Sequence, residues 1–221
     1  MTYERSKVKK PGYENSADGN MDGFERAVRQ LGYRSIAGID EAGRGPLAGP
    51  VVAAAIILPT DYRDRDIRDS KKLSASRRET LFNRICTDAV SVGIGMVEHS
   101  VIDEINILRA ALLAMEKAVS NLAVPADYLL IDGKDTIKLP IPQQAIIKGD
   151  SRSISVASAS IIAKVTRDRI MDEYHELYTE YNFRQHKGYG TREHRAAIKK
   201  HGLCHIHRKS FSIKMSDLTE K

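Results

Sequence analysis

Acidic side chains follow three of the short apolar runs in this sequence. Asp40 and Glu41 follow the first run, Asp132 follows a second and Asp150 follows a third. Because ligands in open α/β sheets bind beyond the carboxyl ends of strands, neighbouring strand ends would gather these four acids. Such a cluster repels itself unless a cation is present, and Mg²⁺ prefers carboxylate and water oxygens. The acids therefore predict a divalent-metal site of the kind used in two-metal phosphodiester cleavage.

Each of these acids also has a purely structural interpretation. Asp132 and the glycine after it could form a plain turn, and Asp150 could be a helix-entry residue near an N-cap. Adjacent side chains on a strand point to opposite faces, which separates Asp40 from Glu41. The strand must therefore twist or end there, or Glu41 must act partly through its backbone. The sequence leaves these alternatives open.

Two other polar features of the sequence do not fit the divalent-metal site predicted from the four acids. Asp168 would lie roughly 22 Å from the start of a helix beginning near Ser153, too far to share an ion with Asp150. We interpret it as a surface ion-pair partner of Lys164, one turn earlier. A second set is rich in histidine, but its spacing matches no standard structural zinc site. Its members are His201, Cys204, His205 and His207.

Three segments carry groups suited to binding nucleic acid. Glycines at 43 and 45 would let backbone groups approach a ligand closely, and such groups at a ribose 2′-OH can distinguish RNA from DNA. Residues 70–72 could bind phosphates, and an aromatic ring between glycines at 189 could stack on a base or sugar. A turn or a surface loop would explain each segment equally simply. The candidate residues are Gly43, Arg44, Gly45, Ser70, Lys71, Lys72 and Tyr189.

The positive charge is concentrated near the C-terminus. The chain has 35 basic and 29 acidic residues, which gives a net charge of +6. Residues 184–214 alone have a net charge of +8, so the rest of the chain has a net charge of −2. A localised basic patch is the electrostatic footprint of a polyanion partner, most often nucleic acid. A solvated basic helix is the alternative.

Length and composition exclude several classes of protein. The 221 residues fit one generous domain, and 42% hydrophobic with 29% charged residues is ordinary for a globular protein. The longest apolar run, Val51 to Leu58, is far shorter than the roughly 20 residues of a membrane span. The N-terminus has no apolar core typical of a secretory signal, and two distant cysteines favour a reduced cytosolic compartment. We therefore expect a cytoplasmic protein, not a membrane, secreted or fibrous one.

The chemistry-bearing residues must be positioned by alternating strands and helices. Val/Ile-rich runs predict strands, helical spacing predicts helices, and a capping-box spacing at Ser76 predicts a helix start. The expected strands are 36–39, 51–58, 90–97, 128–131 and 145–147. The expected helices are 21–31, 76–89, 107–122, 153–181 and 192–201, with a solvated loop at 61–69. This order predicts an α/β fold with a mixed sheet and helices on both faces.

The motifs together resemble the type 2 ribonuclease H (ribonuclease HII) family. The matching segments, in the same order, are GIDEAGRGPLAGPV at 38–51, DSKKL at 69–73, IDG at 131–133, the run at 148–168, HKGYGT at 186–191 and HRKSF at 207–211. The resemblance spans about residues 35–214. It implies a ribonuclease H-like mixed five-stranded sheet flanked by helices, with a C-terminal helical segment. We expect an N-terminal extension at 1–34, a catalytic domain at 35–214 and a tail at 215–221.

The resemblance also implies an activity. Such an enzyme cuts the RNA strand of RNA–DNA hybrids and cuts duplex DNA 5′ of a single embedded ribonucleotide, leaving a 3′-OH and a 5′-phosphate. The four acids would be Mg²⁺ or Mn²⁺ ligands, residues 43–45 would read the 2′-OH, Tyr189 would pack on the neighbouring deoxynucleotide sugar, and residues 70–72 would hold phosphates. We expect a monomer with no clear protein partner. The rival hypotheses are a non-catalytic hybrid-binding module and a nuclease of the same fold restricted to long hybrids.

Overall fold

A five-stranded mixed sheet forms the centre of the molecule, in the order β3-β2-β1-β4-β5. The computed structural model describes residues 21–68 and 74–211. The antiparallel pairs are β1–β2 and β2–β3, and the parallel pairs are β1–β4 and β4–β5. The strands are β1 Ile36–Ala42, β2 Val51–Ile57, β3 Ser91–Val97, β4 Tyr128–Asp132 and β5 Gln143–Ile146. The expected mixed five-stranded sheet is confirmed.

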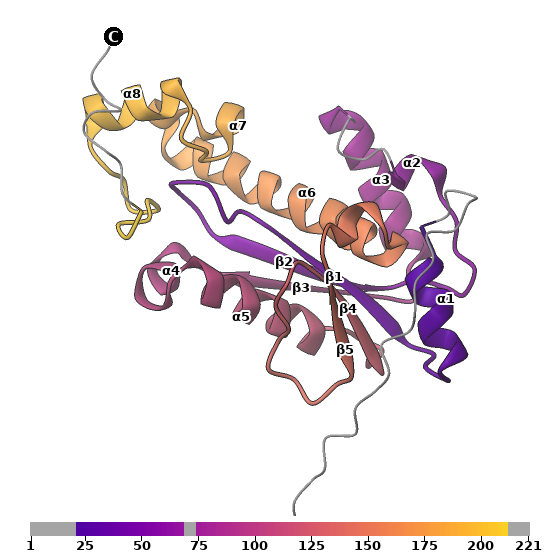
Figure 1. Cartoon of the computed structure of the whole chain (residues 1–221). Helices are drawn as coiled ribbons and strands as arrows, with labels where there is room; N and C mark the ends of the chain where they lie inside the picture. Colours follow the sequence, from indigo (N-terminus) through magenta and orange to yellow (C-terminus); the bar gives the residue numbers. More distant parts are fainter. Residues whose placement is uncertain (1–20, 69–73, 212–221) are drawn as a thin grey trace, which may run out of the picture.

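Helices cover both faces of this sheet (Figure 1). One face packs on α5, with α4 beside it, and buries β-strand and helix side chains in one apolar cluster. The other face packs on the long helix α6, with α3 against α6, around a second cluster. These helices are α3 Ala75–Asp88, α4 His99–Ile105, α5 Ile107–Ser120 and α6 Ile154–Leu177.

The close approach of helices to the sheet depends on small residues. A Cβ on Gly38 of β1 would lie 2.2 Å from the backbone carbon of Ser155, at the start of α6. A Cβ on Gly95 of β3 would lie 2.0 Å from the carbonyl oxygen of Ala114 in α5. Because backbone atoms cannot retreat as a side chain can, these glycines fix how near each helix lies to its strand. The sheet thereby holds α6 directly over β1.

The helix α1, Gly23–Gln30, packs onto the body of the molecule. Its Phe24 and Val28 are buried in a cluster with side chains of β1, β4, β5 and α6. Glu25 is 3% exposed, and its Oε1 accepts hydrogen bonds of 2.6 Å from the hydroxyls of both Ser153 and Ser155. The helix expected at 21–31 is thus confirmed, and it is anchored at the N-terminus of α6. The proposed division at residue 34 stays a prediction.

Several local predictions are wrong. The N-cap of α3 is Ser74, whose hydroxyl accepts from the Arg77 amide at 3.4 Å, so the capping box does not start at Ser76. The segment expected as a solvated loop contains a short helix, and α4 was not predicted. The helix expected to reach 181 ends at Leu177 and is followed by a 3₁₀ turn. The shorter elements are α2 Arg65–Arg68, η3 Thr179–Tyr181 and α7 Phe183–His186.

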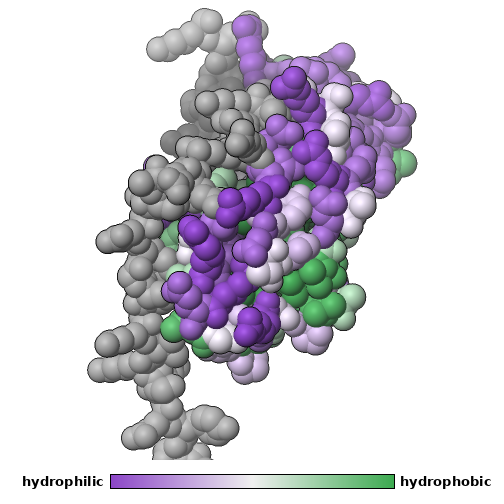
Figure 2. All heavy atoms as spheres, turned by 90° about the vertical axis from the view of Figure 1, so that its right-hand side faces the viewer, coloured by the Kyte–Doolittle hydropathy of each residue, from purple (hydrophilic) through white to green (hydrophobic). Residues whose placement is uncertain are grey.

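The basic C-terminal part contains α8, Arg192–His201, with the bounds expected for it. In Figure 1, α7 and α8 lie at the far end of α6, away from α1. Figure 2 shows that the face on the α1 side is mostly hydrophilic, with a limited hydrophobic area. Among the described helices, none is both long enough and apolar enough to cross a membrane.

Candidate active site

Two central strands bring the first acids together. Strands β1 and β4 are parallel neighbours, and Ile39 pairs with Ile131 in their register. Asp40 and Asp132 are therefore the next residues along two adjacent strands running in the same direction. This is the gathering at carboxyl ends that the positions of the acids in the sequence predicted.

Asp40 is the most buried of the four acids. It is 5% exposed on the side of the sheet covered by α6. Burial raises the pKa of Asp40 well above its ordinary value, and the charges of Glu41 and Asp132 raise it further, while the Ser160 hydroxyl of α6 opposes the rise. The three carboxylates are therefore close enough to repel each other.

Glu41 also has a raised pKa, mainly because of burial and in part because of Asp132. The guanidinium of Arg44 opposes this rise through an ion pair of 3.2 Å with Glu41 Oε1. Strand β1 continues past both acids to Ala42, so the strand does not end at the pair. The Glu41 side chain nevertheless reaches the pocket in front of β1, and its amide donates to Asp40 Oδ1 at 2.8 Å.

Asp150 lies in the segment that follows β5. The 3₁₀ turn η2, Gly149–Ser151, joins β5 to α6 and contains Asp150. The Gly149 amide donates to Asp132 Oδ1 at 2.6 Å, which fixes this turn beside the end of β4. Asp150 is half-buried, one residue from that contact.

The donor chemistry of these acids suits a hard divalent cation. Among the described residues, no three His, Cys, Asp or Glu side chains are already arranged as a ligand set. Burial is the main cause that raises the pKa of Asp40 and Glu41, and the charge of Asp132 adds to both rises. A bound cation would stabilise the charged form of each carboxylate and so oppose both effects. Carboxylate oxygens are the ligands that Mg²⁺ and Mn²⁺ prefer. The residues present thus fit the expected ions.

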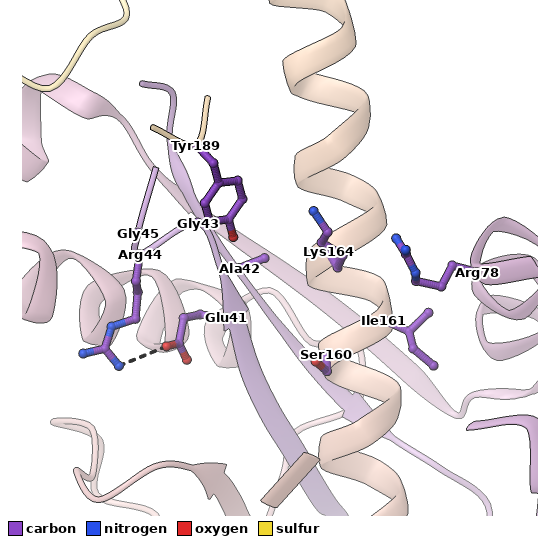
Figure 3. Close-up of a pocket in the computed structure, with 10 residues that line it drawn as sticks. All are labelled: Glu41, Ala42, Gly43, Arg44, Gly45, Arg78, Ser160, Ile161, Lys164 and Tyr189. Atoms are coloured by element: carbon purple, nitrogen blue, oxygen red, sulfur yellow. Dashed lines mark hydrogen bonds and ion pairs between the residues drawn. The ribbon is translucent and has the colours of Figure 1, made fainter. Parts of the chain in front are cut away.

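A pocket of about 410 Å³ lies against Glu41. Figure 3 shows Tyr189 beside the loop that carries the two glycines and across from Lys164 of α6. A Cβ on Gly45 would lie 3.5 Å from the Tyr189 ring, and the Lys164 ammonium lies 5.9 Å from the ring centroid. Tyr189 is 42% exposed, so its ring is available to a ligand. Of the candidate binding residues, the pocket brings together Gly43, Arg44, Gly45 and Tyr189.

The pocket also contains residues that were not predicted. Arg78 comes from α3, and Ser160 and Lys164 come from α6. Lys164 lies within the resemblance at 148–168, but helical phase and the packing of α3 on α6 were needed to place it here. Ser70, Lys71 and Lys72 lie outside the described residues.

Asp168 and the histidine-rich group, which the sequence did not assign to the metal site, make contacts of their own. Lys164 donates to Asp168 Oδ1 at 2.6 Å, so the predicted ion pair is confirmed; Arg78 lies 3.9 Å from the same carboxylate. His207 Nε2 lies 3.0 Å from Nε2 of His194, a residue outside the set considered for zinc.

Comparison with known proteins identifies the family. The family model described as ribonuclease HII matches residues 37–214. The ribonuclease HII of Syntrophus aciditrophicus is 60% identical over 194 residues, covering 88% of this chain and 92% of that protein. The ribonuclease HII of Geobacter metallireducens is 56% identical over 201 residues, covering 91% and 94%.

Solved structures agree with this assignment. The ribonuclease H2 of Pyrococcus horikoshii has a TM-score of 0.70 and 27% identity, covering 84% of this chain and 97% of that one. Ribonuclease HII in the PCNA complex from Archaeoglobus fulgidus has a TM-score of 0.69 and 26% identity, covering 82% and 96%. A ribonuclease HIII at 20% identity shares the fold, with a TM-score of 0.59. The chain belongs to the ribonuclease HII family and is thus a nuclease of the ribonuclease H type.

Proposed function

We propose that this chain is a divalent-metal-dependent endonuclease that cuts the RNA strand of RNA–DNA hybrids. We further propose that it cuts duplex DNA 5′ of a single embedded ribonucleotide, leaving a 3′-OH and a 5′-phosphate, and so supports removal of ribonucleotides from DNA. The observation that carries the proposal is the shared pocket, where the glycine loop and Tyr189 adjoin Glu41. A group able to read a ribose thus lies next to the acids that could support cleavage.

In this proposal Asp40, Glu41, Asp132 and Asp150 hold Mg²⁺ or Mn²⁺. When bound, a pair of such ions supplies an activated water and charge stabilisation at the leaving oxygen. The hydrogen bond from the Gly149 amide to Asp132 orients that carboxylate in advance, and the hydroxyl of Ser160 does the same for Asp40. Preorganised carboxylates need little rearrangement before ions and substrate arrive.

The chain's other residues would bind and orient the substrate. Backbone groups at 43–45 would contact the 2′-OH, since glycines carry no side chain that would keep a sugar away from the backbone of this loop. Arg78 and Lys164 would attract phosphates, and the Asp168 carboxylate between them holds both side chains toward the pocket. Phosphate contacts fix the register of a duplex, while the loop supplies the discrimination.

A nicking assay tests the proposal. A labelled DNA duplex with one ribonucleotide, incubated with Mg²⁺, should give a single product that ends 5′ to the ribonucleotide. The same duplex without ribose should stay uncut, and chelation of the metal should abolish cleavage. Cleavage of a long hybrid alone would favour the narrower nuclease. Binding without cleavage of either substrate, at high enzyme, would leave only the hybrid-binding module.

The remaining expectations are proposals too. Cytoplasmic location and a monomeric state rest on the sequence alone. The expected lack of a protein partner has no support from the comparisons, because the Archaeoglobus relative was solved in complex with PCNA.

A further inference from the structure

Two arginines are buried at the back of the ribose-reading loop. Arg167 of α6 and Arg208, in the segment after α8, are each 1% exposed. Burial lowers the pKa of Arg167 to about 10, and burial together with the charge of Arg167 lowers the pKa of Arg208 to about 9. Both side chains therefore remain charged at neutral pH, close enough to repel each other. Such a pair is unfavourable unless its hydrogen bonds are well satisfied.

Backbone carbonyls, not carboxylates, accept these hydrogen bonds. Arg208 donates to four carbonyl oxygens at distances between 2.6 and 3.2 Å, and Arg167 donates to three at distances between 2.9 and 3.1 Å. The acceptors for Arg208 belong to Gly43, Arg44, Gly49 and Pro50. The two guanidinium groups thus hold both ends of the β1–β2 connection, at residues 43–44 and 48–50.

The glycine at the start of this connection is required by the same contact. Gly43 has φ +101°, and a Cβ there would lie 2.2 Å from Arg167 Nε and 2.8 Å from the carbonyl oxygen of Pro50. Gly43 O in turn accepts from Arg208 Nη2 at 2.6 Å. The conformation of the loop is therefore matched to the two side chains below it.

The pair also fixes the other wall of the pocket. Arg167 Nη1 donates to Lys187 O at 2.9 Å, and its guanidinium carbon lies 5.9 Å from the centroid of the Tyr189 ring. Between these residues, Gly188 O accepts from the Leu47 amide at 2.8 Å. Arg167 thus contacts both the loop and the segment that carries Tyr189.

Arg208 is itself held in place by backbone contacts. Its amide donates to Leu47 O at 2.8 Å, and the Gly49 amide donates to Ile206 O at 2.9 Å. Asp103 of α4 accepts from the amides of the next two residues, at 2.9 and 2.8 Å. These contacts fix the backbone of Arg208, so its guanidinium reaches the loop carbonyls from a fixed position.

We propose that Arg208 and Arg167 are positioning residues that set the spacing between the 43–45 loop and Tyr189, and so determine the preference for a ribonucleotide over a deoxyribonucleotide. This inference rests on the proposed function of that loop. A guanidinium is suited to the task because its five donors lie in one rigid plane, whereas a lysine offers a single centre that cannot serve four carbonyls.

The test compares binding preference, not activity alone. The full chain is titrated, with chelator present, against two DNA duplexes that differ only in one embedded ribonucleotide; the preference is the ratio of the two Kd values. Arg208→Lys keeps the positive charge but loses the planar guanidinium with its five donors. Met115→Ala, in the core of α5 on the opposite face of the sheet, is the control for lost stability.

The proposal expects Arg208→Lys to lower the preference about fivefold or more, roughly the effect of one lost hydrogen bond, while Met115→Ala keeps the wild-type preference. An unchanged preference in Arg208→Lys, or an equal loss in both variants, overturns it. If Arg208→Lys does not fold, Arg167→Lys replaces it with the same two outcomes. A wild type without any preference would remove the proposed role of the 43–45 loop, and the inference with it, whereas failure of the cleavage function itself would appear in the nicking assay.

Discussion

Asp132 combines a fixed position with a role that only its charge can fill. Its Oδ1 accepts from the Gly149 amide at 2.6 Å, and its charge contributes to the raised pKa of both Asp40 and Glu41. Asp132→Asn preserves an acceptor for Gly149 but removes the charge that a cation would need. We expect nicking to fall at least about a hundredfold while the Kd for a ribonucleotide-containing duplex changes little.

Single-turnover cleavage and fluorescence anisotropy measure the two quantities. Asp168→Asn is the matched control, since Asp168 is an acid of the same type that pairs with Lys164 and Arg78. Asp168→Asn should raise the Kd for the duplex more than it lowers the rate at which the bound duplex is cleaved. Full cleavage activity in Asp132→Asn would remove Asp132 from the catalytic set.

At the scale of elements, the sequence predicted the strands and helices whose apolar residues recur with a strand or helix period. Five short apolar runs located every strand of the sheet, and the ends of β1 and β4 located three of the four acids. It did not predict α4, whose seven residues include three polar or charged ones besides its histidine, or which of two nearby serines caps α3. Nothing in the sequence predicted that Arg167 and Arg208 lie behind the 43–45 loop, because only the folded loop provides their carbonyl acceptors. Arg78 and Lys164 were missed as pocket residues for the same reason, since helix packing brings them together.

The helix α1 stabilises the start of α6 through one buried carboxyl. Glu25 Oε1 accepts from both serine hydroxyls and from the Ser155 amide at 3.1 Å. Glu25→Ala leaves these donors buried without that acceptor, and should lower the free energy of unfolding by about 2–3 kcal/mol. Glu25→Gln keeps an acceptor and should cost clearly less, because burial already raises the pKa of Glu25 and disfavours its charge.

Urea unfolding of these variants, with Gln30→Ala as an exposed control on the same helix, measures the difference. Equal stability of Glu25→Ala and Gln30→Ala would mean that α1 contributes little to α6. Because α6 begins four residues after Asp150, a fall in nicking that accompanies the loss of stability would connect α1 to the active site.

Two neutral histidines connect α8 to the segments on either side of it. The Cys204 amide donates to His207 Nδ1 at 2.9 Å, so His207 Nε2 donates to His194 Nε2 at 3.0 Å, and His194 Nδ1 donates to Tyr189 O at 3.0 Å. Burial is the main cause that lowers the pKa of each histidine to about 4. Protonation of either ring would break this chain of donors.

These lowered pKa values predict a pH-dependent stability. Between about pH 6.5 and 4 the unfolded chain binds more protons than the folded one, so the free energy of unfolding falls as the pH falls through this range. Each extra proton changes it by about 1.4 kcal/mol per pH unit. His194→Gln should reduce this slope in urea unfolding measured across the range, and His201→Gln, an exposed control on α8, should not. The same slope in both variants would contradict the assignment.

At the scale of the whole molecule, positive charge and acids lie in different segments of the chain. Residues 184–214 carry +8, and the acids lie at the ends of β1 and β4 and in η2. Lys199 and Lys200 are exposed near the end of α8, at the far end of α6. A duplex bound in the pocket can extend over this basic part and release counterions from its phosphates. The binding of any duplex should therefore weaken steeply with salt, independently of the ribose.

Neutralising Lys199 and Lys200 should reduce the salt dependence of duplex binding and leave the preference for a ribonucleotide unchanged. In the double variant Lys199→Gln/Lys200→Gln, the slope of log K against log salt should become shallower by up to about 2, nearly one unit for each lost phosphate contact. The ratio of Kd values for duplexes with and without a ribonucleotide should stay at the wild-type value, because phosphate contacts position a duplex without reading its sugars. Arg109→Gln, on the exposed side of α5 across the sheet, should leave the slope unchanged. If Arg109→Gln lowers the slope as much as the double variant does, net charge and not the basic C-terminal part governs binding.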